Sequence, residues 1–86
     1  MRLDDIRGEL LKAKPKFTHY PIGIQRCLLN MAYNMGVPNL MGFKKMFTAL
    51  DAQDYAEAGL EALDSKWARQ VPNRAMEIAN EIMKGE

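Results

Sequence analysis

The chain has 86 residues, of which 48% are apolar, 27% are charged and only ten are glycine or proline, so it is neither collagen-like nor disordered. Its formal net charge is +1, and residues 1–30 carry six basic against three acidic side chains. That excess is far below the charge of typical nucleic-acid-binding proteins. No apolar run approaches the ~18 residues of a membrane span, so no nucleic-acid or membrane partner is predicted.

The length fits one domain over residues 1–86, near the lower limit for a self-sufficient core. Residues 1–5 hold an arginine and two aspartates and no apolar run, so no signal peptide is predicted. One cysteine, Cys27, excludes an internal disulfide framework, and one histidine, His19, argues against a metal centre. We expect neither a metal nor another cofactor.

Composition favours helix along the whole chain. Ala, Leu and Met total 26 residues, whereas the β-branched Val, Ile and Thr total nine. The sequence therefore predicts an all-α fold, a compact orthogonal bundle of about six short helices. In chain order the predicted helices are Leu3–Ala13, Ile22–Met35, 40–50, 52–63, Lys66–Gln70 and Pro72–Lys84. Residues 14–21 and 37–39 contain proline and are predicted to be a loop and a turn.

Local signals mark most helix ends. Asp51 is predicted to cap helix 52–63, with Asp54 three positions on, and Ser65 to cap the next helix. Pro72 stands in the first turn of the last helix, and Gly85 follows its end. The side chains that share an inward face at helical spacing are Leu3, Ile6 and Leu10; Ile24, Cys27, Leu28, Met31, Ala32 and Met35; Phe43, Met46, Phe47 and Leu50; Tyr55, Ala58 and Gly59 or Ala62; and Ala75, Ile78, Ala79 and Ile82.

No residue is a strong candidate for a catalytic nucleophile or a catalytic acid or base. Cys27 falls on the apolar face of its helix, where a thiol acts as a small hydrophobic side chain, and His19 falls in a loop between prolines. Hydrolysis of a glycosidic bond needs one protonated and one ionised carboxyl group in fixed geometry. Most of the eleven acidic residues fall at helix starts or on exposed faces. No catalytic residue is therefore predicted.

Trp67 and Arg74 are the most distinctive functional candidates. Trp67 lies on a helix of one to two turns, and Arg74 lies in the first turn of the next helix, where a cation opposes the helix dipole. Two interpretations stay open. Arg74 either meets a specific anionic partner, or it is a surface side chain, for example one that bridges to Asp64 or Glu77.

Four sequence blocks resemble the C-terminal lobe of the phage-type lysozymes, the muramidases of tailed phages. They are Asn-Met-Ala-Tyr-Asn-Met-Gly at 30–36, Gly-Phe at 42–43, Ser-Lys-Trp at 65–67 and Gln-Val-Pro-Asn-Arg-Ala at 70–75. Their spacing matches from about residue 26 to 75. Residues 1–13, through Asp-Asp-Ile-Arg-Gly at 4–8, resemble the later half of the helix that joins the two lobes of that family. Residues 22–84 then correspond to the helices of the C-terminal lobe.

The resemblance implies cleavage of the bond between N-acetylmuramic acid and N-acetylglucosamine in peptidoglycan. The catalytic acid, second carboxylate and threonine of the family lie in an N-terminal lobe, and no position here matches them. We therefore expect this chain to supply one wall of the substrate cleft and to be inactive alone.

The same resemblance implies roles for five residues. Tyr33, Asn34, Met46 and Glu61 fall where the family contacts substrate, and Arg74 falls where an arginine meets the catalytic glutamate of the other lobe. Met46 and Glu61 replace the short polar side chains that the family usually has there.

The main hypothesis is thus a C-terminal lysozyme lobe that is made in the cytoplasm of an infected bacterium and acts at its cell wall. The alternative is a repurposed helical module that binds a protein through the face an N-terminal lobe would cover. Expected partners are peptidoglycan, an N-terminal lobe in trans, or a second copy of the chain. Self-association is expected because Leu3, Ile6, Leu10 and Leu11 would expose apolar surface without the other lobe.

Overall fold

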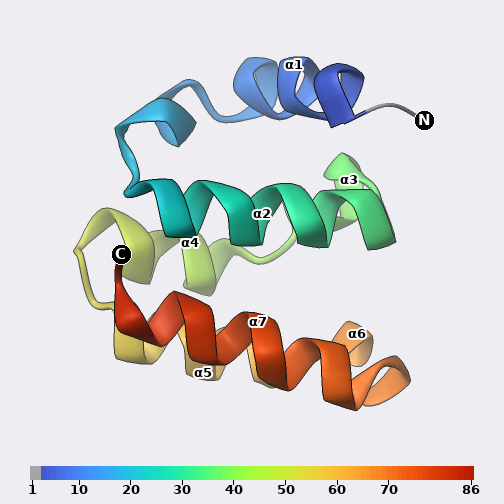
Figure 1. Cartoon of the computed structure of the whole chain (residues 1–86), viewed down its shortest axis with the longest axis vertical. Coiled ribbons are helices and arrows are strands. Elements are labelled where there is room, and N and C mark those ends of the chain that lie inside the picture. The colour runs from blue at the N-terminus through green and yellow to red at the C-terminus, as the bar shows by residue number, and fades with distance from the viewer. Residues whose placement is uncertain (1–2) are drawn as a thin grey trace.

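The computed structural model describes residues 3–86, and all regular structure within that range is helical (Figure 1). This confirms the predicted all-α class. The elements are α1 (Leu3–Ala13), the 3₁₀ helix η1 (Pro15–His19), α2 (Ile22–Met35), α3 (Val37–Leu40), α4 (Lys44–Asp51), α5 (Tyr55–Leu63), α6 (Lys66–Gln70) and α7 (Pro72–Lys84). None of these helices combines the length and apolarity needed to cross a bilayer.

Helix α2 lies between α1 and α7 in the view of Figure 1, and it packs against α1, α3 and α7. Helix α5 packs against α7 and α4, and α6 packs against α7 and α5. The short helices α3 and α6 therefore lie at the same end of the fold, beside the C-terminal end of α2 and the N-terminal end of α7 (Figure 1).

Several helix boundaries follow from the predicted end signals. The Ser65 hydroxyl accepts a hydrogen bond from the Ala68 amide at 3.1 Å and caps α6. Pro72 begins α7, and Gly85 ends it in the left-handed conformation with φ of +68°. These three predictions are confirmed.

The predicted cap at Asp51 is wrong. Helix α4 continues through Asp51, and α5 begins after Asp54, whose carboxylate accepts a hydrogen bond from the Glu57 amide at 3.2 Å. The turn between them closes at Gln53, which has φ of +60°. The Gln53 amide donates to the Leu50 carbonyl and the next amide donates to the Ala49 carbonyl, so the backbone itself closes α4.

Two segments predicted to lack helix contain short helical turns. The predicted loop 14–21 contains η1, which begins at Pro15 and buries Phe17 completely. The predicted turn 37–39 forms most of α3, and the following helix starts at Lys44 rather than at residue 40. Proline at the first positions of η1 and α3 fixes φ near the helical value, so it begins these turns instead of preventing them.

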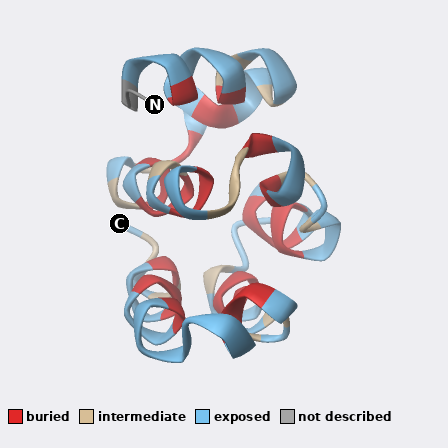
Figure 2. Cartoon of the chain, turned by 90° about the vertical axis from the view of Figure 1, so that its right-hand side faces the viewer, coloured by how far each residue is buried: buried red, intermediate tan, exposed pale blue. Residues whose placement is uncertain are grey.

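The core joins the inner faces of the helices, as the burial colours show (Figure 2). The predicted inward faces of α2, α4 and α7 are all buried or half-buried, and Gly59 and Ala62 of α5 are both buried. The expectation that α1 exposes an apolar face is wrong for Ile6 and Leu10, which are 1% and 0% exposed against α2 and α3. Leu11 is half-buried, and the side chain of Leu3 lies outside the description.

A close approach between α5 and α7 depends on glycine. A Cβ atom at Gly59 would lie 2.5 Å from Cγ of Met83 and 2.9 Å from the carbonyl oxygen of Ala79. Alanines 58, 62, 75 and 79 are also buried along these two helices. Small side chains therefore let the two helix backbones lie close together and fix the position of α6, which follows α5.

A polar cluster ties the N-terminal segment to α4. The Tyr20 hydroxyl donates to Oδ1 of Asp51 at 2.5 Å, and the Lys14 ammonium lies 3.1 Å from Oδ2. Lys14 also lies over the Phe47 ring, 5.2 Å from its centroid. The Tyr20 hydrogen bond, followed by Lys14, lowers the pKa of Asp51, while burial and the same carboxylate raise the pKa of Tyr20.

This cluster makes stability depend on pH. Tyr20→Phe is expected to lower the free energy of unfolding by about 1–2 kcal/mol at neutral pH, because a charge-assisted hydrogen bond is lost. The folded-state pKa of Asp51 lies below its unfolded value, so the carboxylate stabilises the fold above about pH 4 and less as the pH falls through the folded pKa. Urea melts of the wild type and Tyr20→Phe at about pH 7 and pH 2 measure the difference in their free energies of unfolding. This difference should be smaller at the lower pH.

Tyr33→Phe, which removes the hydroxyl of an exposed side chain away from the cluster, is the matched control. It is expected to change stability by less than about 0.5 kcal/mol at either pH. If the free energy of unfolding of Tyr20→Phe differs from that of the wild type by the same amount at neutral and acid pH, the role of Asp51 is contradicted.

Candidate functional site

Two adjoining hollows lie at the end of the fold that holds α3 and α6, the first between the C-terminal end of α2 and helix α6, and the second between the start of α4 and the C-terminal end of α5. The first encloses about 580 Å³ and the second about 490 Å³. The first is lined by Asn34, Met35, Asn39, Phe43, Ser65, Lys66, Trp67, Gln70 and Val71. The second is lined by Asn39, Gly42, Phe43, Lys44, Lys45, Met46, Glu61, Asp64 and Ser65. Three residues are common to both, so we treat the hollows as one surface, the α2–α6 groove.

An aromatic pair joins the two sides of the groove. The Phe43 and Trp67 rings meet edge to face, with centroids 6.5 Å apart and planes at 77°. Phe43 directly precedes α4, and Trp67 lies in the first turn of α6, where the Ser65 cap holds it. The groove therefore depends on a turn and a cap that are 22 residues apart in sequence.

Amide side chains supply hydrogen-bonding groups at the rim. Asn39 donates through Nδ2 to the Met35 carbonyl at 2.7 Å, and Asn34 donates to the carbonyl and Oδ1 of Asn30 at 2.8 and 3.1 Å. Both side chains are exposed. Their own Oδ1 atoms accept no hydrogen bond from other described residues, so they can accept one from a ligand.

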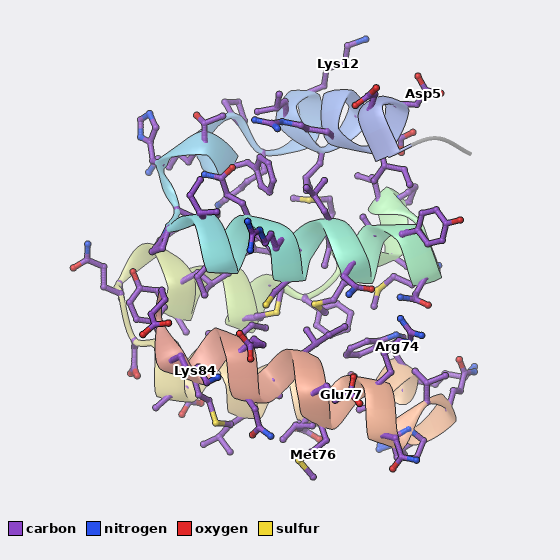
Figure 3. All side chains as sticks on the ribbon, in the orientation of Figure 1. Asp5, Lys12, Arg74, Met76, Glu77 and Lys84 are labelled. Atoms are coloured by element: carbon purple, nitrogen blue, oxygen red, sulfur yellow. The ribbon has the colours of Figure 1, made fainter. Side chains whose placement is uncertain are left out.

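Arg74 connects to the rim through Asn30. It points from α7 toward α2 (Figure 3), where its Nη1 atom lies 3.4 Å from Oδ1 of Asn30, the atom that also accepts from Asn34. Ion pairs within residues 3–86 join Lys14 to Asp51 and Lys84 to Glu81. The suggested bridge from Arg74 to Asp64 or Glu77 is therefore not formed among the described residues. The exposed guanidinium contacts a neutral amide at long range.

Comparison with known proteins finds relatives of this sequence. Two probable T4-type lysozymes of Dictyostelium discoideum are 34% and 33% identical to the chain over 58 residues, 67% of the chain. The pre-baseplate central spike protein Gp5 of Enterobacteria phage T4 is 38% identical over 61 residues, 71% of the chain and 11% of Gp5. The chain is a relative of the phage-type lysozymes. No family model and no solved structure matches it.

The match covers 34% of each T4-type lysozyme, so the chain spans about a third of the length of these relatives. The predicted resemblance to the phage-type lysozymes is confirmed, and the assignment to their C-terminal lobe stays a prediction. Activity, substrate and partners of the longer relatives are not thereby assigned to these 86 residues.

The predicted substrate residues of this lysozyme relative do not all line the groove. Asn34 lines the first hollow, and Met46 and Glu61 line the second. Tyr33 is 59% exposed on α2 but lines neither hollow. Met46 is completely buried, whereas Glu61 is half-buried, so Glu61 has the more accessible side chain of the two. Their substrate roles stay predictions.

Sequence reasoning missed Asn39 and Gln70 as groove residues. Asn39 was assigned only to a turn, and Gln70 only to the end of a short helix and to a sequence block. The proximity of α3 and α6 creates their site, and nothing in the local sequence signals it. Phe43 and Lys66 belonged to matched blocks without an assigned role.

The remaining candidate groups lack the environment of catalytic residues. Burial, helped by Glu81, raises the pKa of the Cys27 thiol to about 11, so the thiolate is scarce at neutral pH. The pKa of Glu57 is raised, first by a hydrogen bond with Glu61, but Glu57 is exposed to solvent. Within residues 3–86, no three His, Cys, Asp or Glu side chains come together as a metal site.

The raised pKa of Glu57 can be tested through its neighbour. Glu61→Gln replaces the neighbouring carboxyl group with an uncharged amide, so the pKa of Glu57 is expected to fall toward its ordinary value of about 4.3. A carboxyl-carbon NMR titration measures it. Asp64→Asn, at a carboxylate that does not perturb Glu57, is the control and is expected to leave the titration unchanged. An unaltered Glu57 titration in Glu61→Gln would contradict this cause.

Proposed function

We propose that the chain acts as the C-terminal lobe of a phage-type lysozyme and that the α2–α6 groove forms one wall of its peptidoglycan cleft. The observation that carries this proposal is the connection from Arg74 through Asn30 to Asn34 at the rim of the groove. It joins an exposed cation to a hollow of polar and aromatic side chains, in a relative of the T4-type lysozymes.

The groove has the chemistry of a saccharide or peptide site. Aromatic rings pack against the apolar faces of sugars and peptides, while amide side chains hydrogen-bond their polar groups. Phe43 and Trp67 supply the first kind of contact, and Asn34, Asn39 and Gln70 supply the second. The cleft wall thus binds and orients the polymer, whereas cleavage requires other groups.

The acidic residues of the chain support a division of labour with an N-terminal lobe. A general acid for glycoside hydrolysis needs a raised pKa in a protected site. Glu57, whose pKa is raised, is exposed, and Asp51, bound by Tyr20, has a lowered pKa. We therefore assign cleavage of the bond between N-acetylmuramic acid and N-acetylglucosamine to carboxyl groups of a second lobe.

Arg74 is the contact to that lobe. Its hydrogen-bond partner among the described residues is the Asn30 amide oxygen at 3.4 Å, and no described carboxylate forms an ion pair with it. A carboxylate brought by the second lobe would form a charge-assisted hydrogen bond with the guanidinium. Such a bond would also fix Asn30 and, through it, the rim side chain Asn34.

Clearing of a cell-wall suspension tests the division of labour. The chain alone is expected to leave turbidity unchanged, and a mixture with the separately produced N-terminal lobe of a T4-type relative is expected to clear it. Clearing by the pure chain that disappears in Glu61→Gln or Glu9→Gln would overturn the proposal. Failure of the mixture to clear, with failure of the two pieces to associate, would favour the alternative of a lobe repurposed as a helical protein-interaction module.

Arg74→Ala tests the contact between lobes. Its effect on the stability of the chain is expected to stay within about 0.5 kcal/mol, because an exposed charge without an ion pair is lost. Its affinity for the N-terminal lobe is expected to fall by at least tenfold, since a charge-assisted hydrogen bond contributes about 1.5–3 kcal/mol.

Arg26→Ala removes the same charge from an exposed position of α2 and serves as the matched control. Titration calorimetry measures the affinities, and urea melts measure the stabilities. Equal affinities for Arg74→Ala and Arg26→Ala, or a stability loss above about 1.5 kcal/mol in Arg74→Ala, would reject the assigned contact.

A further inference from the structure

Among the buried side-chain nitrogen and oxygen atoms of the described residues, Nε1 of Trp67 has no hydrogen-bond partner. The side chain is 8% exposed. Buried polar groups are nearly always paired, so an unpaired indole N–H indicates a ligand, water or alternative side-chain position that completes it. Trp67 lines the first hollow of the α2–α6 groove, so the side chain that carries this buried donor borders an open binding surface.

The surroundings of Trp67 offer acceptors and an apolar surface together. The side-chain Nδ2 atoms of Asn34 and Asn39 donate to backbone carbonyls of α2, and their Oδ1 atoms are the available acceptors. The Phe43 ring provides an apolar surface against the indole. One donor, nearby acceptors and one aromatic surface therefore line a single hollow.

A secondary amide matches this set of groups better than the other common polar groups. Its carbonyl accepts a hydrogen bond, its N–H donates one, and its alkyl substituent packs on an aromatic ring. A carboxylate would satisfy the indole N–H but repel the asparagine oxygens. A hydroxyl group alone would leave the Phe43 face uncovered.

We propose that the indole N–H of Trp67 donates to the carbonyl oxygen of a secondary amide in the bound ligand. This inference rests on the proposed function, because it specifies which chemical group the cleft wall recognises. Two sources carry that group in a glycan–peptide polymer, the acetamido group of an amino sugar and the amide of a peptide.

Access to the indole requires movement at the rim. Nε1 itself has almost no exposed surface, whereas Asn34, Asn39 and Gln70 are exposed and line the same hollow. A ligand amide that reaches Nε1 turns at least one of these side chains aside. Their side-chain amide signals should therefore change together with the indole signal.

The single tryptophan gives a direct readout, because the chain has one indole N–H resonance. The full chain is titrated with the tetramer of N-acetylglucosamine, with an N-acetylated alanine dipeptide, and with cellotetraose, which lacks the amide. At least one amide-bearing probe is expected to move the indole proton downfield and to slow its exchange with solvent about tenfold or more. Cellotetraose is expected to do neither, and the responding probe identifies the source of the amide.

A variant separates the hydrogen bond from the aromatic contact. Trp67→Phe keeps a ring but removes the donor, so its affinity for the responding probe is expected to fall about tenfold. Tyr55→Phe, which loses a hydroxyl away from the first hollow, is the matched control and should bind as the wild type does. If Trp67→Phe does not fold, the titration of the wild-type indole decides alone.

Three results would overturn the inference. They are an indole signal that stays unchanged at every probe concentration, a response to cellotetraose equal to that of the amide-bearing probes, and undiminished affinity in folded Trp67→Phe. The proposed function fails separately, through the absence of association with, and clearing by, an added N-terminal lobe. Clearing by that mixture with a silent indole would retain the lobe assignment and reject the amide contact.

Discussion

Helix α2 packs against α1 and α3 on one side and α7 on the other, and this burial on two sides constrains where the remaining helices lie. Its side chains Ile24, Leu28 and Met31 are completely buried. A helix enclosed in this way has only a narrow strip left for solvent, and in α2 that strip carries Ile22, Arg26, Asn30, Tyr33 and Asn34. Of these exposed side chains only Asn34 lines the groove, and it lies in the last turn of α2, the helix that α3 follows.

The candidate site depends on two kinds of packing at once. Close contact of α5 with α7 around Gly59 fixes where the chain enters α6, and the Ser65 cap then holds Trp67 against Phe43. On the other side, Asn30 accepts from both Arg74 and Asn34 and so couples α7 to the rim. The groove and the proposed contact of Arg74 with a second lobe are thus connected by hydrogen bonds through Asn30.

The sequence predicted the features that local physics controls. Helical spacing identified the inward faces, and Ser65, Pro72 and Gly85 marked ends because caps and fixed dihedral angles act over a few residues. The prediction of a helix cap at Asp51 was wrong because this residue binds Tyr20 and Lys14, which lie 31 and 37 positions away in the sequence. The same limit applied to the groove, since Asn39 and Ser65 come together only through tertiary packing. The family resemblance supplied Asn34 and Arg74, whereas the unpaired indole of Trp67 required atomic positions.

Helix α1 has its main contacts with η1, α2 and α3, while α5, α6 and α7 pack chiefly among themselves and on α2 and α4. The polar cluster of Lys14, Tyr20 and Asp51 adds a tie between the two groups. Contiguous units joined by few contacts open separately in native proteins, and hydrogen exchange detects such partial opening. Opening of α1 would expose Ile6 and Leu10, which are buried against α2 and α3, but it would not break the contacts of α5 and α6 with α7, so the Trp67 side of the groove would keep its support.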